Sequence, residues 1–125
     1  MSKITEGYQT ITPYLIINNA AGFIRFTQDV FGAVIINKYM RDGESTIMHA
    51  EIKIGNSIIM FAESTAEYKP MNAGLFIYVE DADATYKKAL DNDATVVTEL
   101  SNQSYGRSGG VKDTFGNTWW ITSVI

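Results

Sequence analysis

The residues best suited to chemistry are His49 and Glu51, the single histidine of the chain and a carboxylate two positions after it. Residues two apart in a β-strand point to the same face, so the two side chains are expected to lie together. A histidine beside a carboxylate can serve as a general base, an acid–base pair or part of a facial metal site. The other interpretations are contact with a bound ligand, or a solvated or structural role. In the last case the strand buries its opposite face, formed by Met48, Ala50, Ile52 and Ile54.

Arg107 is a further candidate because it lies in the glycine-rich segment SYGRSGG, residues 104–110. The backbone amides of such a segment can approach an anion, and a guanidinium can bind a carboxylate or phosphate through two hydrogen bonds. The alternative is a mobile hairpin with a solvated arginine. Within residues 63–72, Glu63, Glu67 and Tyr68 either close over a ligand as a lid or belong to a plain connection.

The composition is that of one folded domain. The 125 residues are 46% hydrophobic and 19% charged, close to the average for globular proteins. The absence of cysteine excludes disulfides and thiolate chemistry and fits a reducing compartment. The net charge is −4 with scattered basic residues, so no nucleic-acid partner is expected. We find no signal-peptide-like run and no apolar run of the roughly 18 residues that span a membrane, so we expect a cytoplasmic protein with no membrane partner.

Hydrophobic patterning places His49 and Glu51 in the first of two similar halves. This half is predicted to contain a strand at 10–17, a helix at 20–31 and strands at 34–40, 45–54 and 56–62. Asn18 and Asn19 can cap the helix, and Gly32 can end it. The pairs Asp42–Gly43 and Gly55–Asn56 favour hairpin turns between the strands.

The second half repeats this order. It has a strand at 75–79, a helix at 82–90 capped by Asp81, a strand at 94–100, a glycine-rich run at 104–113 and a last strand at 118–125. Ala94 follows Ala33 by 61 positions, and Gly116 follows Gly55 by the same number, which indicates an internal repeat. We therefore predict an α+β fold in a single domain, residues 1–125. Two tandem βαβββ modules, at about 8–62 and 73–125 around a linker at 63–72, would pair into a cup-shaped mixed β-sheet with the helices on the outside.

Short motifs in this order resemble a known group of proteins. They are Pro13-Tyr14-Leu15-Ile16, Val30-Phe31-Gly32-Ala33, His49-Ala50-Glu51, Tyr78-Val79-Glu80-Asp81, Tyr105-Gly106-Arg107-Ser108 and Asp113-Thr114-Phe115-Gly116-Asn117-Thr118-Trp119. Together with the duplication they are similar to the vicinal-oxygen-chelate superfamily of glyoxalase I, bleomycin-resistance proteins and extradiol dioxygenases, and within it to the PhnB-like branch. The resemblance implies a homodimer.

The resemblance also points to the positions where metal-dependent members carry their ligands, on the first and fourth strands of each module. Counting from the helix caps and from the two Gly-Asn turns, these positions are Thr12, Gly74, Ile59 and Trp120. Nearby positions offer Tyr14, two residues after Thr12, and Trp119, one residue before Trp120. None of these side chains is a usual metal ligand, so we expect no cofactor; a divalent metal held through His49 and Glu51 is the disfavoured alternative.

Strand alternation predicts an aromatic cup. It groups Ile59 with Phe61, Phe76 with Tyr78, and Trp120 with Thr122 on the concave side, and it puts Trp119 under the helix. The expected ligand-binding residues are Tyr14, His49, Glu51, Phe61, Phe76, Tyr78, Tyr105, Arg107 and Trp120.

Three functions are compatible with this cup. The leading hypothesis is a metal-independent protein that binds an aromatic or cationic small molecule. The alternative is a lyase, isomerase or dioxygenase-like enzyme that uses His49 and Glu51, with or without a divalent metal. A regulatory or structural module without a ligand is the third.

Overall fold

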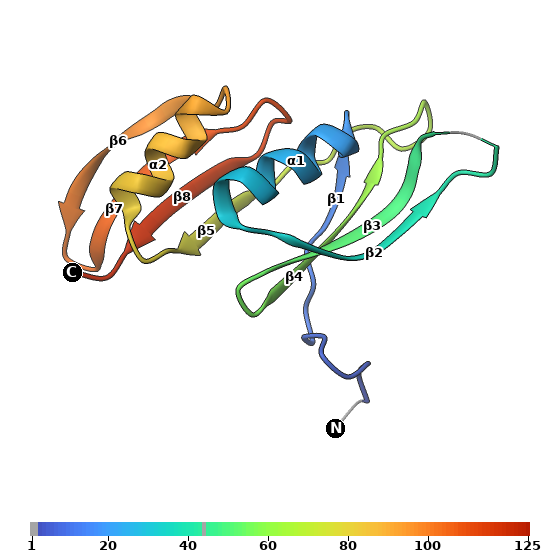
Figure 1. Ribbon diagram of the computed structural model, residues 1–125, viewed down its shortest axis with the longest axis horizontal. Helices are drawn as coiled ribbons and strands as arrows, with labels where there is room; N and C mark the ends of the chain where they lie inside the picture. Colours follow the sequence, from blue (N-terminus) through green and yellow to red (C-terminus); the bar gives the residue numbers. More distant parts are fainter. Residues whose placement is uncertain (1–2, 44) are drawn as a thin grey trace. The chain divides into compact units, whose positions relative to one another are not determined.

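A computed structural model describes residues 3–43 and 45–125, and the chain divides into two compact units, the first ending at Met71 and the second beginning at Asn72. Each unit has one helix lying over a four-stranded mixed sheet (Figure 1). The α+β fold and its two repeated βαβββ modules are therefore confirmed. Within the described ranges, the structure has no helix that is both long and apolar enough to cross a membrane.

The first unit contains β1 (Tyr14–Ile17), α1 (Ala20–Phe31), β2 (Val34–Met40), β3 (Ile47–Ile54) and β4 (Ser57–Glu63). The strand order is β1-β4-β3-β2, with β1 parallel to β4 and the other pairs antiparallel. The predicted strand at 10–17 was too long, because pairing begins only at Tyr14. Pro13 has no backbone N–H to donate, and its carbonyl instead accepts from the Met60 amide at 3.0 Å.

Helix α1 has the predicted bounds and caps. Asn19 lies in the left-handed region and its side chain accepts from the Gly22 amide, while Gly32 ends the helix at φ 70°. The buried side of the helix packs on β3 and β4, where the rings of Phe23 and Phe61 meet edge to face at 5.0 Å. Ala50, Ile52, Ile59 and Phe61 form the sheet side of this core.

The expected buried face of β3 was wrong at one residue. Ala50 and Ile52 are fully buried, but the side chain of Met48 is 51% exposed. Tyr39 pairs with His49 while Met40 pairs with Ile47, so β3 has one extra residue, Met48, at this point. Such a β-bulge reverses the alternation of side chains, and Ile47 takes the buried position instead.

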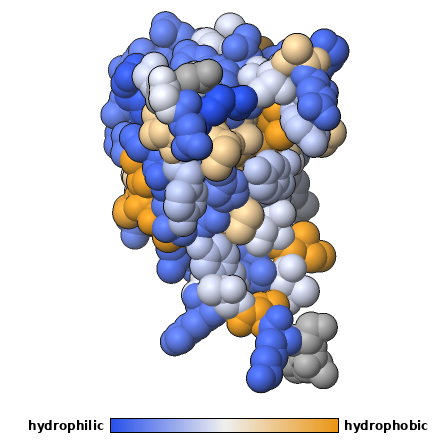
Figure 2. Space-filling model, turned by 90° about the vertical axis from the view of Figure 1, so that its right-hand side faces the viewer, coloured by the Kyte–Doolittle hydropathy of each residue, from blue (hydrophilic) through white to orange (hydrophobic). Residues whose placement is uncertain are grey.

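Strand β2 forms one edge of the first sheet. A second register shift, between Ile35 and Asn37, interrupts its pairing with β3 and leaves the bulged Ile36 partly exposed. On the face of the molecule in Figure 2, hydrophobic surface occurs in separate patches among hydrophilic residues. A bulged edge strand is a poor template for pairing with another strand.

The second unit contains β5 (Gly74–Tyr78), α2 (Ala82–Asp91), β6 (Thr95–Gln103), β7 (Gly106–Lys112) and β8 (Thr118–Ser123). The strand order is β5-β8-β7-β6, the same as in the first unit. Asp81 caps α2 as predicted by accepting from the Ala84 amide. In this unit Trp119 is buried under α2, and Trp120 points to the opposite face, as predicted.

The glycine-rich run is an inner strand of the second sheet rather than a mobile hairpin. A Cβ atom at Gly109 would lie 2.8 Å from the Tyr86 ring of α2, and one at Gly110 would lie 2.5 Å from the Trp120 ring. The two glycines thus let a helix-borne ring and an indole lie directly against β7 from opposite sides.

A buried polar network holds the turn before β8. The Asp113 carboxylate accepts from the amides of Phe115 and Asn117 at 2.9 Å each and from Trp119 Nε1 at 2.8 Å. Asp113 is only 4% exposed, and Asn117 is fully buried. This network fixes a loop of five residues between β7 and β8, in contrast to the loop of two between β3 and β4.

Candidate functional site

The candidate site begins on the open face of the first sheet, opposite α1. Strand pairing places Tyr14, Met60, Glu51 and Asn37 in one row across the four strands. On the neighbouring row, Tyr39 pairs with His49. Side-chain alternation and strand pairing therefore bring the titratable groups of β1, β2 and β3 to one face.

Glu51 is the centre of a hydrogen-bond network on this face. Its Oε1 accepts from the Tyr8 hydroxyl and from Asn37 Nδ2 at 2.9 Å, and its Oε2 faces His49 Nε2 at 2.8 Å. Asn37 Nδ2 also donates to the Tyr8 hydroxyl at 3.2 Å. The Glu51 side chain is only 10% exposed, so these partners take the place of water.

The network changes the pKa values of two groups in opposite directions. Burial by itself raises the pKa of Glu51, but hydrogen bonds from His49, Tyr8 and Asn37 outweigh it, so the pKa lies below its usual value. The hydrogen bond to Glu51 raises the pKa of the Tyr8 hydroxyl. Glu51 is therefore a carboxylate and Tyr8 a neutral phenol at neutral pH.

His49 connects this buried carboxylate to the surface. Its Nδ1 lies 3.1 Å from the Tyr14 hydroxyl, and its ring lies between the rings of Tyr14 and Tyr39, at 5.6 and 6.1 Å. The His49 side chain keeps 22% of its surface exposed. Glu51, His49 and Tyr14 thus form a continuous chain of hydrogen bonds that ends at a half-exposed phenol.

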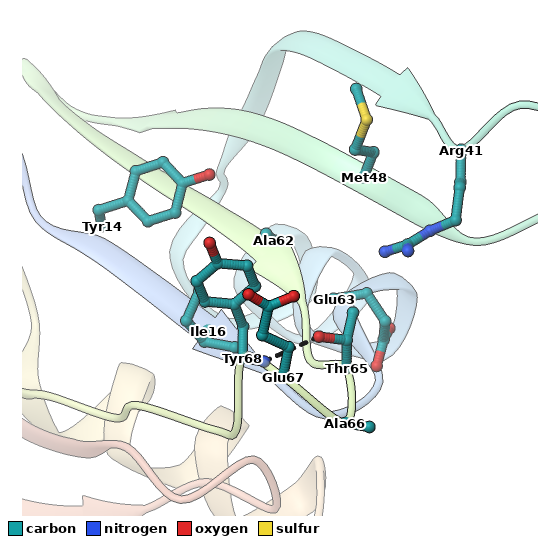
Figure 3. A pocket seen from close by; sticks show the side chains of 10 residues that line it. All are labelled: Tyr14, Ile16, Arg41, Met48, Ala62, Glu63, Thr65, Ala66, Glu67 and Tyr68. Carbon is teal, nitrogen blue, oxygen red and sulfur yellow. Dashed lines mark hydrogen bonds between the residues drawn. The ribbon is translucent and has the colours of Figure 1, made fainter.

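Tyr14 lines a pocket of about 550 Å³ that lies entirely within the first unit (Figure 3). Its wall consists of Tyr14, Ile16, Arg41, Met48, Ala62, Glu63, Thr65, Ala66, Glu67 and Tyr68. The hydroxyls of Tyr14 and Tyr68 and the carboxylate of Glu67 point toward its interior in Figure 3. Small-molecule sites have volumes of roughly 300–1,000 Å³ and mostly apolar walls with a few polar groups, and this pocket has both features.

The segment after β4 forms one side of the pocket and is attached to β1 at both of its ends. The Ser64 amide donates to the Ile17 carbonyl at 2.8 Å, and Met71 and Ile16 exchange two backbone hydrogen bonds. Between them, Thr65 and Tyr68 form a turn through two bonds of 2.8 Å. This segment, for which a lid and a plain connection were both considered, is therefore attached to the sheet on both sides of its turn.

The three predicted lid residues have different positions. Glu67 and Tyr68 are exposed on the wall. Glu63 is the last residue of β4, and its carboxylate accepts from the amides of Asn19 and Ala20 at 2.8 Å each. Glu63 therefore caps the N-terminus of α1, where a negative charge is favoured.

The open face of the second unit carries four of the predicted ligand-binding aromatics. Phe76 lies 5.2 Å from the Tyr78 ring and 6.1 Å from the Tyr105 ring, and it pairs with Trp120 across the sheet. Phe76, Tyr78 and Tyr105 are each at least half exposed. These four residues form an aromatic surface, and their predicted contact with a ligand stays a prediction.

Two predicted ligand-binding residues lie elsewhere. Phe61 is fully buried against Phe23 under α1. Arg107 lies on the α2 side of the second sheet, where its Nε donates to Asp83 Oδ1 at 2.8 Å and its Nη1 to Asn102 at 3.1 Å. Neither side chain is on an open face. Phe61 was expected on the open face because alternation was counted from the Gly-Asn turn, and the two β-hairpins before the last strands have loops of different length. Arg107 was a candidate because of its glycine-rich segment, which does not indicate the face on which the side chain lies.

The difference in length between the loops before β4 and β8 also shifts, by one residue, a position at which metal-dependent relatives would carry a ligand. Counting from the Gly-Asn turns pairs Ile59 with Trp120, whereas strand register puts Met60 on the open face in the position that corresponds to Trp120. Ile59 is buried with Phe61 instead. The thioether of Met60 and the indole of Trp120 are poor partners for a hard divalent ion.

The donor set of the open face does not fit a divalent metal. Glu51 uses both carboxylate oxygens for Tyr8, Asn37 and His49, and His49 uses both ring nitrogens. Three or more convergent His, Cys, Asp or Glu side chains are not found at any place among residues 3–43 and 45–125. A metal would have to displace several of these hydrogen bonds and would gain only two protein ligands.

Several residues of the site had no signal, or only a weak one, in the sequence. Tyr8 and Asn37 bind Glu51, yet Tyr8 precedes the first strand and follows no periodic pattern. Arg41 and Met48 line the pocket, and Met48 reaches it only because of the bulge in β3. The one available signal was the polar Asn37 in the otherwise apolar start of a strand.

The fold class is therefore that of proteins with two βαβββ modules in tandem, each with one open sheet face. The chain belongs to the Glyoxalase/Bleomycin resistance protein/Dioxygenase superfamily, which it matches over residues 9–121. The resemblance noted from the sequence motifs is therefore confirmed.

Three proteins are similar to the chain, one in sequence and two in fold. The uncharacterized protein Mb0911c of Mycobacterium bovis is 30% identical over 127 residues, covering 92% of this chain and 83% of its own. The PhnB protein of Bacillus cereus matches with a TM-score of 0.72 at 20% identity, over 93% of this chain and 100% of the other. TnmS3, an antibiotic binding protein from Streptomyces sp. CB03234, matches with a TM-score of 0.69 at 14% identity, over 94% and 100%. At these identities the two structures share the fold with this chain.

Proposed function

We propose that the protein binds a small aromatic molecule or organic cation without the help of a metal. The observation that carries this proposal is the pocket of about 550 Å³ in the first unit, with Tyr14, Tyr68 and Glu67 on its wall. Tyrosine rings attract cations through their faces, and a carboxylate adds negative charge. The antibiotic-binding function of TnmS3, a neighbour in fold, is consistent with this use of the fold.

The metal independence is supported by the donor set. Glu51 and His49 have their polar atoms engaged by protein groups, so a ligand would meet the Tyr14 hydroxyl and the other side chains of the pocket wall rather than an ion. The exposed aromatic surface of the second unit, at Phe76 and Trp120, is a second place where an aromatic ligand could stack.

Calorimetric titration of protein treated with a chelator, against a panel of aromatic cations including bleomycin-type compounds, tests the proposal. Binding that is unchanged by added Mg²⁺, Mn²⁺ or Zn²⁺ is expected. Tryptophan fluorescence reports on the second unit, because both tryptophans are there, and amide chemical shifts report on the pocket. No heat and no shift across the panel would contradict the proposal.

A second candidate is an enzyme of the lyase, isomerase or dioxygenase-like type. The chain from Glu51 through His49 to Tyr14 favours it, because a phenol backed by an imidazole and a carboxylate can transfer a proton at the pocket. Metal analysis separates the two candidates. A stoichiometric ion that is bound by the wild type and lost in His49→Ala would favour the enzyme.

The homodimer is also a proposal, supported by the family resemblance. Sedimentation equilibrium of the purified protein at micromolar concentration tests it, and a single species of 13.9 kDa would contradict it.

A further inference from the structure

The direction of the hydrogen bonds from Glu51 to Tyr14 can be worked out from the partners. A carboxylate can only accept hydrogen bonds, so the neighbouring His49 Nε2 must carry a proton. In its neutral form the imidazole has only this one N–H, so Nδ1 of neutral His49 is an acceptor. The Tyr14 hydroxyl, 3.1 Å away, therefore donates its proton to Nδ1.

This direction decides what Tyr14 offers to the pocket. A hydroxyl has one proton and two acceptor lone pairs, and the proton is already used for His49. The free lone pairs of the Tyr14 oxygen remain for a molecule in the pocket that Tyr14 lines. The ionised carboxylate of Glu67, which also lines the pocket, has no proton to donate and can only accept hydrogen bonds from a ligand.

We propose that Tyr14 determines the ligand specificity of the pocket by acting as a fixed hydrogen-bond acceptor, and that the preferred ligands are aromatic amines in their ammonium form, with at least one N–H. His49 and Glu51 are positioning residues in this arrangement. The inference rests on the proposed function and deepens it, because it distinguishes N–H cations from quaternary cations that have no proton to donate.

One isosteric substitution, Glu51→Gln, should reverse the direction of the hydrogen bonds from residue 51 through His49 to Tyr14, because of the groups that surround residue 51. Tyr8 and Asn37 both donate to Oε1, so in Glu51→Gln they hold the amide oxygen at that position. The amide nitrogen then faces His49 Nε2 and donates to it. His49 must carry its proton on Nδ1 instead and donate it to Tyr14, whose own proton turns toward the pocket.

The first experiment reads this direction in the protein without ligand. Nitrogen-15 NMR of the imidazole at pH 8 is unambiguous because the chain has one histidine. We expect the Nε2–H tautomer in the wild type and the Nδ1–H tautomer in Glu51→Gln. An Nδ1–H tautomer in the wild type, or the same tautomer in both proteins, would overturn the inference whatever the protein binds. The amide spectrum of each variant verifies that it is folded.

The second experiment compares two matched probes, 2-(2-naphthyl)ethylamine and its N,N,N-trimethyl analogue, by calorimetry. Tyr14→Phe and Glu51→Gln should each lower the affinity ratio of amine to quaternary cation about 10-fold, the effect of one charge-assisted hydrogen bond. Tyr39→Phe, at the other tyrosine ring beside His49, should leave the ratio unchanged.

The outcomes separate the inference from the proposed function. If both probes bind and Tyr14→Phe leaves their ratio unchanged, the specificity role of Tyr14 is wrong while the binding function stands. If neither probe binds any of the proteins, the proposed ligand class is wrong, and the proposed function is contradicted for aromatic amines. The tautomers of His49 still test the direction of the hydrogen bonds in that case.

Discussion

Replacing Asp113 by alanine should destabilise the second unit more than a typical substitution. The side chain is 4% exposed and accepts from the amides of Phe115 and Asn117 and from Trp119 Nε1. Asn117 and Trp119 are buried to within 1% of their surface, so water has little access to the donors that lose their acceptor.

The magnitude follows from the number of buried donors left without a partner. Each such group costs about 1–3 kcal/mol. For the backbone amide and Nδ2 of Asn117 and the Trp119 indole together we expect a loss of about 3–5 kcal/mol in the free energy of unfolding, toward the lower end of the sum for three buried donors. This is a large part of the roughly 5–15 kcal/mol that stabilises a domain.

Denaturation by urea, followed by tryptophan fluorescence, measures this loss, because both tryptophans belong to the second unit. Trp119→Phe removes one of these three buried donors. In that background Asp113→Ala should therefore cost about 1–2 kcal/mol less than in the wild type. A loss below about 1 kcal/mol, or the same loss in both backgrounds, would refute the assignment of the network as the support of β8.

Three further predictions concern the two sheets. Glu63→Gln should lower the free energy of unfolding by about 1 kcal/mol in urea denaturation, because it removes the negative charge that caps α1. The pKa of Glu51 is lowered on folding from 4.5, so its contribution to stability is complete above pH 4.5 and is lost as the pH falls through the lower pKa of the folded state. Acid denaturation of Glu51→Gln should accordingly be less steep over that range, and an unchanged pH profile would argue against the network. Gly110→Ala should displace the Trp120 ring, 2.5 Å from the new Cβ, and shift its fluorescence, whereas Gly74→Ala, with open space around it, should not.

Much of the secondary structure could be predicted because its signals are local. Asn19 and Gly32 marked the ends of α1, and Asp81 marked the start of α2, because capping depends on residues adjacent to the helix. The equal spacing of two pairs of residues revealed the duplication. His49 and Glu51 were expected on one face of one strand, and they are 2.8 Å apart there.

The predictions of which face a side chain lies on failed where the strand register differs by one residue from a regular count. The bulge at Met48 and the unequal loops before β4 and β8 each shift the alternation of side chains by one. A shift of one residue moves a side chain to the other face of a sheet. Phe61 was therefore expected on the open face although it packs under the helix.

The sequence by itself determined the family, the two modules and the pair His49–Glu51, because periodicity, caps and residue spacing are properties of neighbouring residues. Only the tertiary structure decided what surrounds that pair. Tyr8, Asn37 and Tyr14 come from three separate segments. Strand pairing brings Asn37 and Tyr14 to this carboxylate and imidazole, and the segment before β1 adds Tyr8. The direction of each hydrogen bond, and with it the chemistry that the pocket offers, depends on these distant partners, which no local pattern encodes.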